Sequence, residues 1–217
     1  MDLSVRKKKI LKILEELYPD PRSELNFVNE FQLTICVMLS AQSTDKKVNE
    51  IAPELFREYP DFASLAKAKL SSVEHIIRQV NYYKTKAKNL IATSAKVTKE
   101  YGGTLPRTHA ELISLPGVGN KTANVILSEI GAASTFPVDT HVFRVAKRLG
   151  FASGENPHKV EEELKKLFEK RHWRNMHHWL IFQGRRVCKA QFPRCAECKL
   201  APFCPSRQDS LSKSSAR

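Results

Sequence analysis

The chain has 217 residues, enough for one or two domains with a sizeable buried core, and its longest nearly apolar run (33–39) is far shorter than the roughly 20 residues that cross a bilayer. The N-terminus, MDLSVRKKKI, lacks the apolar stretch of a secretory signal, so we expect an intracellular protein without a membrane span. Lysine and arginine number 36 against 23 aspartates and glutamates, a net charge of +13 that indicates a polyanionic partner: nucleic acid first, an anionic membrane surface second, and otherwise a merely basic soluble protein.

Apolar residues recur at helical spacing along nearly the whole chain, and no run alternates convincingly with the period of a strand. The sequence therefore predicts an all-α protein. The expected helices cover 5–17, 24–39, 48–59, a short segment from 62, 73–80, 85–101, 110–114, 122–130, 142–149, 160–168 and 177–187.

Several expected helices have recognisable end signals. The N-cap candidates are Thr44 or Asp45, Asp61, Ser71 or Ser72, and Thr108. Gly102 and Gly103 directly follow the helix over 85–101 and predict its end. The last residues, 206–217, are rich in serine, lysine and arginine, which predicts a disordered tail.

The stretch LPGVGNKTANVIL, residues 115–127, predicts a tight turn between two short helices. Pro116 disfavours helix at the residue before it, and Gly117 and Gly119 can take the positive φ angles that a sharp turn needs. The unpaired amides at the start of the second helix are suited to a phosphate group. We favour a phosphate-binding hairpin, formed by Gly117, Val118 and Gly119, over an ordinary helix connection.

Lys121 falls in the first turn of that second helix. The positive end of the helix dipole disfavours an ammonium group there, and a neutral lysine amine is a nucleophile that can form a Schiff base with a sugar carbon at the aldehyde level. The alternative is one more lysine that contacts phosphate, and the spacing alone leaves both interpretations open.

Asp139, in the stretch FPVDTH over 136–141, directly precedes the expected helix over 142–149. An N-cap is the default interpretation. Hydrogen bonds from amides stabilise an ionised carboxylate, and such a group beside a reacting sugar can stabilise positive charge or take a proton. The two roles are compatible. We expect the neighbouring His141 to be structural.

Four cysteines near the C-terminus have the spacing C-x6-C-x2-C-x5-C: Cys188, Cys195, Cys198 and Cys204. Four thiolates this close predict a metal site, either a structural zinc or an iron–sulfur cluster. Zinc sites usually have two close cysteine pairs, so the single C-x2-C pair slightly favours the cluster over zinc. Disulfides are the remaining alternative. Cys36 lies in an apolar helix and is expected to be a small buried hydrophobe.

The loop between the first two of these cysteines carries Lys189 and Arg194. A short loop that is closed by a metal site and carries cations would be a rigid surface for phosphate contacts. The alternative is ordinary solvated surface charge.

Together these motifs resemble those of the endonuclease III family, the helix-hairpin-helix base-excision DNA glycosylases with a [4Fe-4S] cluster. LPGVGNKTANVIL resembles the family's hairpin and lysine motif, VDTHVFRVAKRLG resembles its aspartate motif, and the cysteine spacing resembles its cluster motif. LSAQSTD at 39–45 and HHWLIFQGR at 177–185 also fit. The resemblance extends over about residues 5–205.

The resemblance implies two helical domains with a DNA cleft between them. Residues 23–133 would form a six-helix barrel domain with the hairpin, and residues 1–22 with 134–205 would form the cluster domain. Lys121 and Asp139 match the family's catalytic lysine and aspartate and would face each other across the cleft. The implied partner is double-stranded DNA with oxidised pyrimidines or abasic sites, bound by a monomer in the bacterial cytoplasm and at the nucleoid.

The resemblance also implies a reaction, in which a damaged base is flipped out of the duplex, Lys121 attacks C1′, and the resulting Schiff base leads to strand cleavage by β-elimination. Gln42 matches the residue that fills the space left by the flipped base, and Tyr82 falls where the family inserts a wedge. The sequence departs from some members at Asn81, where glycine is common, and at Gln183, where histidine is frequent.

Three alternatives to an endonuclease III-like glycosylase remain. One is a related mismatch-specific glycosylase, although such enzymes generally lack lysine at the position of Lys121. Another is a DNA-binding module that uses the hairpin only for phosphate and has no catalytic activity. The third is a zinc-ribbon regulator. Lesion preference and opposite-base preference depend on the shape of the pocket.

Overall fold

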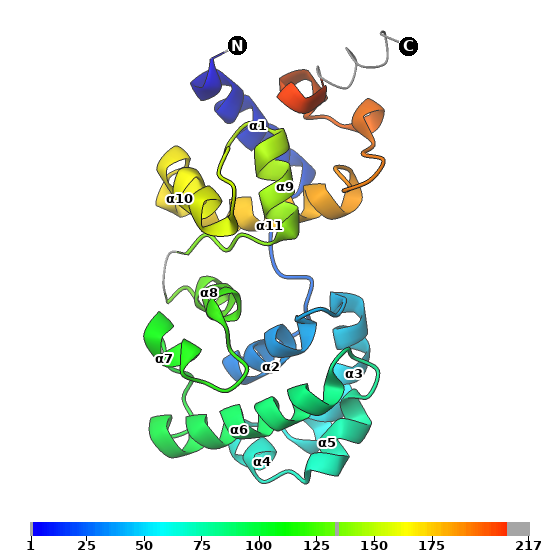
Figure 1. Cartoon of the computed structure of the whole chain (residues 1–217), viewed down its shortest axis with the longest axis vertical. Helices are drawn as coiled ribbons and strands as arrows, with labels where there is room; N and C mark the ends of the chain where they lie inside the picture. Colours follow the sequence, from blue (N-terminus) through cyan, green and yellow to red (C-terminus); the bar gives the residue numbers. More distant parts are fainter. Residues whose placement is uncertain (1, 133–134, 208–217) are drawn as a thin grey trace. The chain divides into compact units, whose positions relative to one another are not determined.

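A computed structural model describes residues 2–132 and 135–207 of the chain. These residues form α-helices and three 3-10 helices, and no strand occurs among them (Figure 1). The all-α prediction is therefore confirmed. Within the same ranges, no helix combines the length and the apolar character that a bilayer span requires.

The chain divides into two compact units, one that runs from Ser23 to Thr135 and one that joins the chain before Ser23 to the chain from Phe136 onward. The described part of the first unit holds seven helices, where the resemblance implied six. They are α2 (Glu30–Ser40), α3 (Asp45–Glu58), α4 (Phe62–Ala66), α5 (Leu70–Ile77), α6 (Tyr83–Tyr101), α7 (His109–Ile113) and α8 (Asn120–Glu129).

The second unit is discontinuous in sequence, because its first helix lies at the start of the chain and the others follow the inserted unit. Its helices are α1 (Leu3–Leu17), α9 (Thr140–Arg148), α10 (Pro157–Leu167) and α11 (Trp173–Arg186). Three 3-10 helices, Lys170–His172, Cys195–Glu197 and Ala201–Phe203, complete its described part.

Local capping chemistry explains where many helices begin. Thr44 accepts a hydrogen bond from the Lys47 amide at the start of α3, and Asp61 and Thr108 each form a reciprocal capping box at α4 and α7. Gly102 ends α6 in the left-handed conformation, with φ of 60°. These four boundary predictions are confirmed.

Several expected helix starts are wrong, among them those at 160 and 177, because α10 begins at Pro157 and α11 at Trp173. The helix expected from residue 24 begins at Glu30, because Asn29 caps it through the amide of Gln32. The helix expected to be capped by Ser71 or Ser72 begins at Leu70, and its N-cap residue, Lys69, makes no side-chain cap. Burial of Val73 and Ile77 in the core of the unit stabilises α5 without a cap.

The prediction of disorder from residue 206 is wrong for the first two residues of that segment. Ser206 and Arg207 lie in a helical turn, where the Ser206 hydroxyl donates to the Arg148 carbonyl at 3.0 Å and the Arg207 guanidinium donates to the Cys195 carbonyl at 3.1 Å. These contacts hold both residues against the cysteine-rich segment. The rest of the expected tail, 208–217, lies outside the described residues.

Each unit has its own hydrophobic core. In the first unit, α6 packs along α4 and α5 (Figure 1), and the core centres on α2, all of whose residues from Leu33 to Leu39 are buried. In the second unit, α9 packs against α11, and Ile10 and Leu14 of α1 are fully buried in the same core. Separate cores are what independent folding of the two units requires.

Cys36 is fully buried in α2, as expected of a small hydrophobe. Burial raises the pKa of its thiol to about 12, and the Asp45 carboxylate acts in the same direction. The thiol therefore remains protonated at neutral pH and takes no part in the cysteine site near the C-terminus.

Candidate functional site

The hairpin between α7 and α8 is built as a tight turn around one left-handed glycine. Gly117 has φ of 78°, and a Cβ atom at this position would lie 2.6 Å from the Asn89 amide nitrogen. Both the backbone angle and the space therefore require glycine here. Gly119 differs from the expectation of a positive φ, because its φ is −92° and a Cβ atom there would meet nothing within 4 Å.

The role of Gly119 follows from its position as the N-cap of α8. It has no side chain to cover the first amides of the helix, and the helix begins without a side-chain cap. These amides point away from the helix with the positive end of its dipole. The start of α8 is therefore open to an anionic group, as a phosphate-binding hairpin requires.

Helix α6 holds the hairpin in place through two hydrogen bonds. The Thr93 hydroxyl donates to the Pro116 carbonyl at 2.7 Å, and the Lys96 amine donates to the Ser114 carbonyl at 3.0 Å. Val118 is buried in the core of the unit, and its amide donates to the Leu115 carbonyl at 3.1 Å. Val118 thus anchors the turn, and its side chain does not contribute to an outer binding surface.

Lys121 is the second residue of α8 and is exposed. Among the described residues, no carboxylate forms an ion pair with its amine. The rigid hairpin and the first turn of the helix fix its Cα, while its side chain remains free to reach a bound molecule. This is a suitable arrangement for an amine that acts on a ligand held at the helix start.

Asp139 is the N-cap of α9 in the second unit, and its carboxylate accepts a hydrogen bond from the Val142 amide at 2.7 Å. The capping role predicted from the sequence is confirmed. The acceptor is the carboxylate oxygen Oδ1, and the residue is half-buried. The cap fixes the position of the side chain.

His141 lies in the first turn of α9 and contacts Arg144, whose guanidinium nitrogen is 3.1 Å from its Nδ1. A guanidinium only donates, so Nδ1 accepts. Burial lowers the pKa of His141, Asp139 opposes that effect, and the cations Arg144 and Arg185 add to it. These contacts fit the structural role expected of this histidine.

Gln42 and Tyr82 are two exposed residues of the first unit with left-handed backbone, with φ of 55° and 58°. Left-handed φ is uncommon in residues other than glycine and persists where the surroundings hold it. Both residues border one cavity of about 180 Å³, together with Gly117 of the hairpin. The structure therefore brings three of the expected DNA-contacting residues together.

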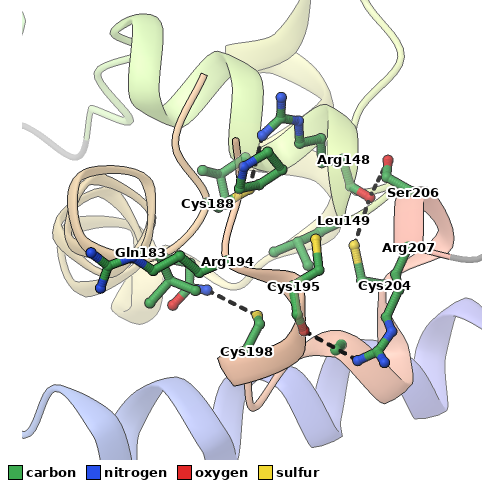
Figure 2. A pocket seen from close by; sticks show the side chains of 14 residues that line it. Arg148, Leu149, Gln183, Cys188, Arg194, Cys195, Cys198, Cys204, Ser206 and Arg207 are labelled. Carbon is green, nitrogen blue, oxygen red and sulfur yellow. Dashed lines mark hydrogen bonds between the residues drawn. The ribbon is translucent and has the colours of Figure 1, made fainter. Parts of the chain in front are cut away.

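The four cysteines of the C-terminal motif border a single cavity of about 230 Å³ in the second unit (Figure 2). They reach it from the end of α11 and from the segment of 3-10 helices that follows. Figure 2 shows the four cysteine side chains arranged around this space, with Arg148, Arg194 and Arg207 at its edges.

The chemistry of this cavity fits a group that carries positive charge at its centre and binds thiolates. Burial raises the pKa of Cys198, and the neighbouring Cys188, Cys204 and Cys195 raise it further. Charged thiolates therefore repel one another here unless a cationic group neutralises them. No three His, Cys, Asp or Glu side chains of the described residues are close enough to share one metal ion.

Hydrogen-bond donors also point at the sulfur atoms. The Gln183 amide nitrogen lies 3.2 Å from Cys198 Sγ, and the Arg148 guanidinium lies 3.4 Å from Cys188 Sγ. Such outer contacts orient thiolate ligands and tune an iron–sulfur cluster. The donor set of this cavity thus fits a four-cysteine cluster.

The loop from Lys189 to Arg194 is exposed throughout and is held to α9 by arginines. The Arg148 guanidinium donates to the Lys189 carbonyl at 2.7 Å and to the Ala190 carbonyl at 3.0 Å. The Arg144 guanidinium donates to the Cys188 carbonyl at 3.1 Å. Lys189 and Arg194 are therefore presented on a fixed loop.

Gln183 is a buried connecting residue, which the sequence analysis noted only as a departure from the resembled family. It is buried, its carbonyl oxygen accepts from the Tyr18 hydroxyl at 3.0 Å, and its amide nitrogen donates to Cys198 Sγ. One side chain thus connects the end of α1 to the cysteine cavity. These partners are distant in sequence, so local patterns do not indicate them.

We expect Gln183→Leu to lower the melting temperature by about 3–10 °C, because the buried Tyr18 hydroxyl loses its acceptor at a cost of about 1–3 kcal/mol. Thermal unfolding followed by circular dichroism measures the effect. Gln79→Leu, at an exposed position, is the matched control and should leave the melting temperature nearly unchanged. Equal melting temperatures for Gln183→Leu and wild type would contradict this role.

Comparison with known proteins gives three findings. Residues 35–170 match the family model described as "HhH-GPD superfamily base excision DNA repair protein". Endonuclease III of Synechocystis sp. is 40% identical over 206 residues, which cover 94% of each chain. Endonuclease III of Escherichia coli strain K12 is 40% identical over 199 residues, which cover 92% of this chain and 94% of the relative.

The fold matches as well. The solved structure of a trapped endonuclease III–DNA covalent intermediate superposes with a TM-score of 0.89 at 38% sequence identity. The superposition covers 97% of this chain and all of that one. The likeness therefore extends over both units of the chain.

Proposed function

Because this chain belongs to the HhH-GPD superfamily of base excision DNA repair proteins and, within it, to the endonuclease III family, we propose that it is a bifunctional DNA glycosylase and AP lyase that removes oxidised pyrimidines. The base-excision glycosylase activity is that of the family. The proposal for a lyase step rests chiefly on one observation, the exposed Lys121 at the start of α8 directly after the hairpin.

Duplex DNA is bound through contacts with its phosphates and through insertion into the base stack. The open start of α8 takes one phosphate, which Gly117 and Gly119 allow to approach the backbone closely. Lys189 and Arg194 take phosphates on the other unit. Gln42 fills the space of the flipped base and Tyr82 acts as the wedge, a role that its exposed ring and fixed backbone support.

Lys121 is the nucleophile. Its neutral amine attacks C1′, the bond from C1′ to the base breaks, and the base leaves with the electron pair and receives a proton. Opening of the sugar ring gives a Schiff base between Lys121 and C1′. Loss of a C2′ proton then expels the 3′ phosphate by β-elimination, and water releases the lysine.

Asp139 assists the first step. An ionised carboxylate near C1′ stabilises the positive charge that develops on the sugar and accepts the proton that the attacking amine loses. The hydrogen bond from the Val142 amide holds the carboxylate in place. The capping role and the catalytic role of Asp139 are therefore compatible.

The four cysteines Cys188, Cys195, Cys198 and Cys204 hold a [4Fe-4S] cluster in this proposal. When bound, the cluster joins the cysteine segments into one rigid unit. Arg148 and Gln183 donate to the ligand sulfur atoms and orient them. Loop 189–194, which is already held by Arg148, then presents its cations to DNA.

We expect the purified protein to be brown with broad visible absorbance, and Cys198→Ser to lose that absorbance, melt at a lower temperature and bind DNA more weakly. Cys36→Ala is the matched control and should keep the colour, because Cys36 lies in the other unit. A colourless wild-type protein that contains stoichiometric zinc would contradict the cluster. Unchanged melting and affinity in Cys198→Ser would contradict a structural metal.

Reductive trapping tests the reaction. Wild-type protein is mixed with duplex DNA that contains one abasic site, and borohydride is added. The expected product is a covalent protein–DNA complex of one-to-one stoichiometry. A protein that binds this DNA and forms no complex would be a mismatch-type glycosylase or a DNA-binding module instead.

A further inference from the structure

Two loops of the first unit meet at their exposed tips, and Asn81 joins them. One loop, 41–43, contains Gln42, and the other contains Asn81 and Tyr82. The Asn81 side-chain amide donates to the Gln42 carbonyl at 2.6 Å, and its backbone amide donates to the Ser43 hydroxyl at 3.2 Å. Gln42 and Tyr82 both have left-handed backbone, so the bonds join two unusual conformations.

A buried lysine holds the same two segments from the inside. Lys86 in the first turn of α6 donates to the Leu39 and Ala41 carbonyls, both at 2.7 Å, and to the Ser43 hydroxyl at 3.2 Å. Burial lowers the pKa of Lys86. Three groups at the end of α2 and in loop 41–43 are thus bound from α6, while the Gln42 carbonyl is bound by Asn81.

We propose that Asn81 is a positioning residue that sets the Gln42 side chain for insertion into DNA and couples its position to that of Tyr82. The inference rests on the proposed roles of these two residues. A left-handed glutamine relaxes readily to ordinary backbone angles when its carbonyl is released, because non-glycine residues disfavour this region. The bond from Asn81 keeps the Gln42 backbone in one conformation before DNA binds. DNA binding therefore does not have to order this loop, and the entropy cost of binding is smaller.

The position of Asn81 supports this role over a general one in folding. Asn81 is exposed and does not belong to the hydrophobic core. The buried Lys86 already holds the neighbouring segment from the side of the core. Its amide binds a backbone carbonyl rather than the Gln42 side chain, which leaves that side chain free to contact DNA. Gln42 and Tyr82 border the cavity of about 180 Å³ together with Gly117.

A double-mutant cycle tests the proposal with the full-length protein. The dissociation constant is measured for duplex DNA that contains a tetrahydrofuran abasic analogue, which binds without reacting. Asn81→Ala is expected to weaken binding about threefold to tenfold, as loss of one hydrogen bond implies. In the Gln42→Ala background it should change binding less than twofold, because the side chain that Asn81 positions is absent.

The control is Asn49→Ala, which removes a similar amide bond, to the Glu24 carbonyl at 2.8 Å, elsewhere in the same unit. It should not change DNA affinity. Wild-type affinity in Asn81→Ala, or an equal loss in both backgrounds, would overturn the inference. If wild type itself neither prefers the abasic-analogue duplex nor forms the trapped complex, the proposed function fails first.

A separate observation concerns Phe192, at the tip of loop 189–194 in the second unit. Its side chain is 89% exposed, and its backbone φ is 51°. An aromatic residue with left-handed backbone is unusual. The loop that carries it is fixed, because Arg148 holds two of its carbonyls and the Arg194 amide donates to the Val187 carbonyl at 3.0 Å.

We infer that Phe192 packs its ring against a deoxyribose or base of the DNA that Lys189 and Arg194 hold by its phosphates. The inference rests on the proposed DNA binding of this loop. An exposed aromatic ring between two exposed cations matches the combination of stacking surface and positive charge found where proteins follow a nucleic-acid strand. The rigid loop presents the ring at little further cost in entropy.

The salt dependence of DNA affinity distinguishes an apolar contact made by Phe192 from a charged contact made by Lys189. Phe192→Ala should weaken duplex binding at least about fivefold at every salt concentration and leave the slope of log affinity against log salt unchanged. Lys189→Ala should reduce that slope by about one. Val28→Ala, at an equally exposed apolar residue of the other unit, is the control and should have no effect. Unchanged affinity in Phe192→Ala, or an equal loss in Val28→Ala, would overturn the inference.

Discussion

Lys121→Gln should form no covalent complex with abasic-site DNA under borohydride and should lose at least about a thousandfold in base excision, because the substitution removes the nucleophile. Folding should be unaffected. Lys121 is exposed, and a neutral residue at the start of a helix avoids the unfavourable contact between an ammonium group and the helix dipole. The melting temperature should stay within about 2 °C of wild type.

The matched control for this variant is Lys84→Gln. Lys84 is the second residue of α6, as Lys121 is of α8, and it is also exposed. The control should retain the trapped complex in full yield, even if it binds DNA somewhat more weakly. Adduct formation by Lys121→Gln at the wild-type rate would show that another amine is the nucleophile and would contradict the assignment.

Asp139→Asn should slow base excision by about 10²–10⁴-fold under single-turnover conditions, because the amide neither accepts a proton nor carries the charge that stabilises the sugar cation. Asparagine caps a helix nearly as well as aspartate. The bond from the Val142 amide therefore persists, and loss of the charge at the helix start should lower the melting temperature by less than about 4 °C.

Asp61→Asn makes the same change at the N-cap of α4, where the Asp61 carboxylate accepts from the Ser64 amide at 2.7 Å. It should lower the melting temperature to a similar extent and leave excision unchanged. Together the two variants separate the capping role from catalysis. Near-normal excision by Asp139→Asn would leave Asp139 with a structural role alone.

Local chemistry explains which parts of this fold the sequence predicts well. A cap such as Thr44, Thr108 or Asp139 acts on amides two or three residues away, so the signal and its target lie in the same window. The apolar face of a helix is equally local. The start of α5 was mispredicted because burial of Val73 stabilises it without a capping side chain.

The candidate site shows where local patterns stop being informative. The hairpin and the four cysteines are contiguous motifs and are visible in the sequence. Lys86 and Gln183 act through partners about 40 or more residues away, 47 to the Leu39 carbonyl and 165 to the Tyr18 hydroxyl. No periodicity or cap marks such a residue, so the structure is needed to find it.

The discontinuous second unit has a consequence for biosynthesis. Helix α1 is translated before the inserted unit, yet the other helices of its core, α9, α10 and α11, are translated after that unit. The inserted unit, from Ser23 to Thr135, has its own core. It can therefore fold before the helices that pack with α1 have been translated. In the proposed cluster, iron and sulfide would then be inserted only after the whole first unit has been translated, because Cys188, Cys195, Cys198 and Cys204 all follow it in the chain.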